Sequence, residues 1–90
     1  MKASNLLPIG SVITVKEANK KMMIIGILQK SKDTKYDYMA VLYPEGYLTQ
    51  KQIYLFNHED IETIFHTGYA DEEREIFIAT LNVVYSSKVE

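Results

Sequence analysis

Short apolar runs alternate with polar, turn-forming segments over most of this chain, a pattern typical of β-strands. Residues 11–16 are rich in β-branched side chains, and residues 21–29 are almost continuously apolar. Both segments predict strands, and Gly26 inside the second predicts a bulge or a bend. Residues 36–43 alternate apolar and polar positions with period two, which predicts a third strand.

The second half of the β region is divided by clear turn signals. Residues 30–35 are charged and predict a loop, and Pro44 with Gly46 predicts a turn. Residues 52–56 and 61–66 predict the fourth and fifth strands. Between them, Asn57 is suited to cap a single helical turn over residues 57–60, because its side chain accepts from nearby backbone N–H groups.

A change to helical periodicity follows Gly68. Asp71 is a suitable N-cap, and the acids Glu72 and Glu73 match the positive end of a helix dipole. The predicted helix runs from about residue 71 to 85, and residues 86–90 are expected to fray. Its apolar positions recur every three or four residues and predict one buried stripe, made of Phe77, Leu81 and Val84 with Ile78 and Tyr85 flanking it.

This order of elements predicts one α+β domain covering residues 1–90, with its strands within residues 11–66. The expected architecture is a small five-stranded antiparallel SH3-like β-barrel with a C-terminal α-helix. The apolar stripe of the helix must be buried somewhere. Packing across the barrel is the expected arrangement, and docking on a partner helix is the alternative.

Composition and charge narrow the classes of function. The 10 basic and 12 acidic residues give a net charge of −2, whereas nucleic-acid binders usually carry a basic excess. The lysines near residues 20–21 and 30–35 are expected at solvated hairpin tips. Without cysteine there is no disulfide, thiolate metal site or thiol nucleophile. The apolar run 22–28 is far shorter than the roughly 20 residues that span a bilayer. We therefore expect a cytoplasmic protein.

No motif for enzymatic chemistry emerges from the sequence. The four glycines are far apart and form no phosphate-binding loop, and neither a G-x-S-x-G elbow nor an H-E-x-x-H zinc motif occurs. His58, Glu59 and Asp60 are consecutive, so they favour a capped turn over a metal site. The acids around residues 71–75 favour a solvated first helical turn. We predict no metal, no cofactor and no enzymatic activity.

Aromatic side chains are the unusual feature of the composition, with seven tyrosines and no tryptophan. Tyrosine offers a large contact area at a low entropic cost and is enriched at protein interfaces. The alternative is that several of these rings close a small barrel and leave the hydroxyl at its rim. We predict a protein-binding surface drawn from Tyr36, Tyr38, Tyr43, Tyr47, Tyr54, Phe56 and His58.

Several short segments occur in a recognisable order along the chain: LLPIGSV at 6–12, KMMIIG at 21–26, YDY at 36–38, LYPEG at 42–46, YLFNHEDI at 54–61, GY at 68–69 and DEER at 71–74. Together they resemble the DUF4176 family over about residues 6–78. One departure is Glu17-Ala18-Asn19, where a more glycine-rich turn is expected. The resemblance implies an accessory protein of type VII secretion systems in Gram-positive bacteria, encoded beside LXG-domain toxins. It implies no catalytic residues.

The expected function is therefore that of a targeting or chaperone-like protein that binds the helical N-terminal region of an LXG toxin. Other small helical accessory proteins are further candidate partners, and edge pairing between copies stays open because small barrels have exposed edges. Two alternatives remain: a small nucleic-acid-binding β-barrel and, as the weaker one, a small enzyme. We expect neither a nucleic-acid nor a membrane partner.

Overall fold

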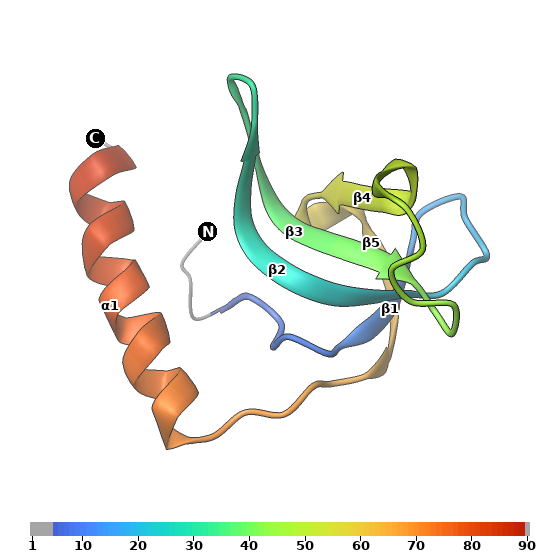
Figure 1. Ribbon diagram of the computed structural model, residues 1–90. Helices are drawn as coiled ribbons and strands as arrows, with labels where there is room; N and C mark the ends of the chain where they lie inside the picture. Colours follow the sequence, from blue (N-terminus) through green and yellow to red (C-terminus); the bar gives the residue numbers. More distant parts are fainter. Residues whose placement is uncertain (1–4, 90) are drawn as a thin grey trace.

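In the computed structural model of this chain (Figure 1), backbone is described for residues 5–89 and side chains for residues 5–84. The described residues form five strands and one α-helix: β1 Val12–Val15, β2 Met22–Ser31, β3 Thr34–Leu42, β4 Ile53–Phe56, β5 Ile61–His66 and α1 Glu72–Val89. Two short 3-10 helices, η2 Gln50–Gln52 and η3 His58–Asp60, precede and follow β4. All five predicted strands are confirmed to within two residues at each end, whereas η2 was not predicted.

The strands form one antiparallel sheet in the order β4-β3-β2-β1-β5. The predicted α+β class is thus confirmed. The sheet is strongly curled (Figure 1), with β4 and β5 at its two edges and η3 joining them in sequence. This curl is compatible with the predicted SH3-like barrel.

The hairpin between β2 and β3 differs from the prediction. Residues 30–35 were expected to be a loop, but the strands continue to Ser31 and resume at Thr34, with Lys30 paired to Lys35. Lys32 makes the tight turn with a φ of 55°. Charged residues are tolerated here because this end of the hairpin projects beyond the core into solvent (Figure 1). The bulge predicted at Gly26 is confirmed by a register shift between Ile24 and Gly26.

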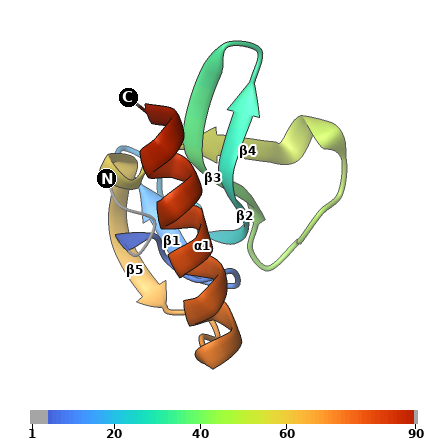
Figure 2. The ribbon, with the colours of Figure 1, turned by 90° about the vertical axis from the view of Figure 1, so that its left-hand side faces the viewer.

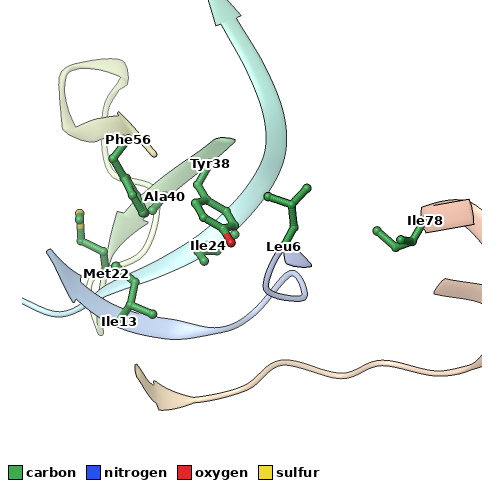
Figure 3. Packing of buried hydrophobic residues seen from close by; sticks show 8 residues of the cluster. All are labelled: Leu6, Ile13, Met22, Ile24, Tyr38, Ala40, Phe56 and Ile78. Atoms are coloured by element: carbon green, nitrogen blue, oxygen red, sulfur yellow. The ribbon is translucent and has the colours of Figure 1, made fainter. Parts of the chain in front are cut away.

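The main core lies on the concave side of the curled sheet. Figure 3 shows its buried side chains, which come from four strands, the N-terminal segment and the helix: Leu6, Ile13, Met22, Ile24, Tyr38, Ala40, Phe56 and Ile78. Leu6 lies between Tyr38 and Ile78 in this view. The N-terminal segment therefore connects α1 to the sheet.

Helix α1 begins as predicted, because the Asp71 carboxylate accepts a hydrogen bond from the backbone N–H of Arg74 at 3.1 Å. It ends at Val89 rather than near residue 85. The predicted buried stripe is wrong in its orientation: Ile78 is 4% exposed, whereas Phe77 is 53% exposed. Leu81 packs against the core as predicted, and the side chain of Tyr85 lies outside the described residues.

The orientation of α1 follows from its contact with the N-terminal segment. The guanidinium of Arg74 donates a hydrogen bond to the Leu6 carbonyl oxygen at 2.9 Å, and Ile78 packs in the cluster that contains Leu6. Figures 1 and 2 show α1 alongside the sheet, with the N-terminal segment between them. Within residues 72–84 the helix face that carries Ile78 is therefore covered, whereas Ile76, Phe77 and Val83 are exposed.

Candidate functional site

The predicted aromatic surface is divided by the fold into buried and exposed residues. Tyr38 is 0% exposed and Phe56 is 6% exposed, so both rings pack mainly in the core. Tyr36 and His58 are half-buried. The remaining three predicted residues have exposed rings: Tyr43, Tyr47 and Tyr54.

Tyr38 holds the N-terminal segment on the sheet through its hydroxyl group. This oxygen accepts a hydrogen bond from the backbone N–H of Leu7 at 2.9 Å and lies 2.7 Å from Nδ1 of His58. The ring contacts that of Phe56, with centroids 5.4 Å apart. Burial raises the pKa of the Tyr38 hydroxyl, because the phenolate would lose hydration in the core.

His58 is held in place by the turn that the sequence predicts, now η3. Its backbone N–H donates to the Asp37 carboxylate at 2.8 Å, and the Asp37 N–H donates to the Asn57 side-chain oxygen at 3.1 Å. The Asn57 N–H donates to the carboxylate of Asp60 at 3.0 Å, which closes the turn. These bonds connect η3 to β3, so the polar groups around His58 serve the fold.

A hollow on the outer face of the sheet, here named the aromatic groove, contains one of the predicted tyrosines. Its volume is about 400 Å³, and it is lined by Gly10, Val12, Lys21, Met23, Tyr43, Phe65 and His66. Neighbouring strands bring these residues together, since Val12 is paired with both Met23 and His66. The ammonium of Lys21 lies 4.8 Å from the centre of the Phe65 ring, within cation–π range.

A second hollow of about 260 Å³ lies where β4 approaches the end of β1. Its lining residues are Val15, Lys16, Met22, Tyr54, Leu55, Phe56 and Asp60. Tyr54 thus borders a different hollow from Tyr43, and the fold does not gather the predicted residues at one point. Both hollows are lined mainly by apolar side chains.

The solvent-facing side of α1 carries a third apolar surface, here named the α1 stripe. It consists of Ile76, Phe77, Thr80, Val83 and Val84. The Thr80 hydroxyl donates to the Ile76 carbonyl oxygen at 3.1 Å, which satisfies this polar group within the helix. These five residues, spaced over two turns of one helix face, therefore offer carbon surface to solvent.

Local sequence patterns do not single out several residues of these surfaces. Lys21 was interpreted as part of a solvated hairpin tip, and Phe65 and Met23 were assigned only to strands. Phe65, however, is exposed in an edge strand, where the Lys21 ammonium lies over its ring. A second signal is the run Ile76–Ile78 in the helix, because one helix face cannot bury three consecutive residues.

The described residues show no gathering of three or more His, Asp or Glu side chains that could hold a metal ion. In the same part of the chain, no helix combines the length and apolarity needed to cross a membrane. Apolar hollows and an open helix face are suited to recognition by contact, because they offer carbon surface and few polar groups.

The fold and its surfaces define a small α+β domain of five antiparallel strands and one C-terminal helix, with large apolar areas open to solvent. The chain belongs to the family described as Domain of unknown function (DUF4176), which matches residues 6–77. This confirms the resemblance in the sequence. No curated protein and no solved structure matches the chain.

Proposed function

We propose that this protein is a non-enzymatic accessory protein that binds the helical N-terminal region of a type VII secreted LXG toxin, as a targeting or chaperone-like partner in the cytoplasm. The observation that carries the proposal is the α1 stripe, an apolar helix face on which Ile76 is 64% exposed, Phe77 53% and Val83 69%. Family membership in DUF4176 adds to it.

The spacing of the α1 stripe suits a helical partner. Ile76 and Val83 are seven residues apart, as are Phe77 and Val84, and Thr80 lies between the two pairs. Apolar positions repeated at this spacing form the contact seam of paired helices. Glu72 and Glu73 precede the stripe and are exposed, which favours basic residues on the facing part of the partner.

The polar chemistry of the molecule supports a binding role over catalysis. General acid–base catalysis needs a polar group that converges with a partner in a pocket that excludes water. The hydrogen-bonded pair of Tyr38 and half-buried His58 instead joins the N-terminal segment to η3 and β3. A chain without cysteine is also suited to a reducing compartment.

The test is co-expression of the full chain with the LXG toxin of its own gene cluster, followed by affinity purification. The N-terminal helical half and the toxic half of the toxin are tested separately. We expect co-purification with the N-terminal half alone. Binding to the toxic half alone would indicate an immunity-like role, and binding to neither folded half would refute the proposal.

Substitutions on α1 locate the contact. Ile76→Glu combined with Val83→Glu places two charges in the α1 stripe, and we expect affinity for the toxin half to fall more than about tenfold. Leu48→Glu is the matched control, because Leu48 is exposed on the connection between β3 and β4, away from the helix. An equal loss of affinity in both variants, or no loss in either one, would contradict a contact through α1.

A further inference from the structure

We propose that the aromatic groove is a binding site for an acidic peptide segment of a partner protein that inserts one large apolar or aromatic side chain. The groove shares no residue with the α1 stripe. This second surface is therefore independent of the proposed helix contact.

The apolar part of the groove is built by the sheet itself. Val12 is buried on β1 and paired with Met23 on β2, so the floor belongs to the paired strands of the sheet. Tyr43 is 44% exposed and Phe65 is 53% exposed, and both rings line the opening. A volume of about 400 Å³ lies at the lower end of ligand pockets, which hold roughly 300–1,000 Å³. One large side chain and its neighbouring main chain fit this space.

The charge at the groove determines the chemistry of its occupant. Lys21 and His66 line the groove, and none of its seven lining residues is acidic. The Lys21 ammonium lies over Phe65, and within the described residues the ion pair present is Lys20 with Glu45 at 2.8 Å. The nearby Glu45 carboxylate is thus already paired with Lys20. A cation placed beside an apolar floor, without a carboxylate partner among the described side chains, attracts a carboxylate from outside.

A peptide satisfies this combination better than a nucleic acid does. Nucleic-acid binding depends on several phosphate contacts, each neutralised by a lysine or an arginine. Lys21 is the only lysine or arginine that lines the groove, and four of the seven lining residues are apolar or aromatic side chains: Val12, Met23, Tyr43 and Phe65. The protein as a whole has a net charge of −2. An acidic segment is therefore attracted locally at Lys21 and held by apolar contact.

The absence of tryptophan from this chain allows a direct binding measurement. The probe is the blocked hexapeptide Glu-Asp-Trp-Leu-Asp-Glu, whose indole fluorescence reports burial when the full-length protein is titrated in. The comparison probe is the blocked hexapeptide Lys-Arg-Trp-Leu-Arg-Lys. We expect saturable binding of the acidic peptide and at least about tenfold weaker binding of the basic one.

Two charge variants locate the site. Lys21→Glu is expected to weaken binding of the acidic peptide about tenfold or more. Lys35→Glu makes the same charge change on the distant β2–β3 hairpin and is expected to leave the affinity unchanged. In an NMR titration, the ring signals of His66 should shift on peptide addition, whereas those of His58, in the Tyr38 network, should not.

Three results would overturn the proposal. The first is equal binding of the acidic and basic peptides, and the second is equal affinity in Lys21→Glu and the unchanged protein. The third is a dimer in sedimentation experiments that Lys21→Glu dissociates, because the occupant would then be a second copy of this chain. Loss of toxin binding in the α1 variants does not bear on these results, since the two surfaces are separate.

Discussion

Tyr38 places a hydroxyl group inside an apolar core, where this group has two hydrogen-bond partners. It accepts from the Leu7 N–H and contacts Nδ1 of His58, while its ring packs on Phe56. A neutral His58 with its proton on Nε2 lets Tyr38 donate to Nδ1 and accept from Leu7 at once. Tyr38, one of the tyrosines predicted for a partner surface, is thus fully buried and holds the N-terminal segment on the sheet.

Replacing the Tyr38 hydroxyl should destabilise the fold. Tyr38→Phe leaves the Leu7 N–H and the His58 nitrogen without their partner, and we expect the free energy of unfolding to fall by about 1–3 kcal/mol. Urea denaturation measures this change in the free energy of unfolding. Tyr54→Phe, at an exposed ring, is the control and should change stability by less than about 0.5 kcal/mol. Similar losses in both variants would argue against this role.

The pKa of Tyr38 predicts a loss of stability in alkali. Because the pKa is raised above its ordinary value of 10.0 in the folded protein, the unfolded chain releases this proton first as the pH rises. The stabilisation is fully present below pH 10 and is lost as the pH rises from there through the folded pKa. Denaturation between pH 8 and pH 12 should show a decline that is shallower in Tyr38→Phe.

Gly68 occupies a position without room for a side chain. A Cβ atom there would collide with the Ile9 carbonyl oxygen, and the Gly68 N–H donates to the buried Ser11 hydroxyl at 2.9 Å. We expect Gly68→Ala to lower the free energy of unfolding by about 1–3 kcal/mol through overpacking. At Gly46 a Cβ atom would meet no other atom within 4 Å, and the backbone φ is 77°. The loss of stability in Gly46→Ala should therefore come from backbone strain alone. A crystal structure of Gly68→Ala should show residues 9–11 displaced.

Among the elements, β5 is an edge strand that the fold protects. Its pairing with β1 shifts register between Val12 and Ile13 and again between Thr14 and Val15. Such bulges bend an edge strand and discourage pairing with another chain. This protection reduces the scope for the edge-to-edge association that the sequence left open.

Helix α1 offers a comparison between two adjacent side chains. Ile78 is buried against the core and Phe77 is exposed. We expect Ile78→Ala to lower the free energy of unfolding by about 2–4 kcal/mol and Phe77→Ala by less than about 0.5 kcal/mol. Thermal and urea denaturation measure both. A larger effect at Phe77 would support the orientation that the sequence predicts.

At the scale of the whole molecule, three distant segments depend on one another. Leu6 lies between Tyr38 and Ile78 (Figure 3), and Arg74 adds a hydrogen bond to the Leu6 carbonyl. The helix is thus attached to the sheet through the N-terminal segment, so loss of this segment should loosen α1 before it disrupts the sheet.

A double-mutant cycle tests this dependence. Leu6→Ala and Ile78→Ala each remove one side of the contact, so we expect the double variant to lose at least about 0.5 kcal/mol less than the two single losses combined. Hydrogen exchange should show faster exchange in α1 of Leu6→Ala, with the amides of β2 and β3 less affected. Strict additivity would contradict the arrangement in which Leu6 connects the helix to the sheet.

Local patterns in the sequence determined the elements of this protein. The period-two alternation of residues 36–43, the β-branched run at 11–16, the bulge at Gly26 and the cap at Asp71 each depend on neighbouring residues, so they could be predicted without a fold. The family membership rests likewise on ordered short segments. The function expected from it stays a prediction.

Only the tertiary structure decided which side chains are covered, because burial depends on segments far apart in sequence. Tyr38 and Tyr43 belong to one predicted strand, yet η3 and the N-terminal segment enclose the first while the second remains at an open groove. The helix α1 carries apolar side chains around most of its own circumference, so periodicity alone could not select its buried face. Contact with Leu6 selected Ile78. The aromatic groove exists because pairing brings Met23, Val12 and His66 together across three strands, with Lys21 just before β2.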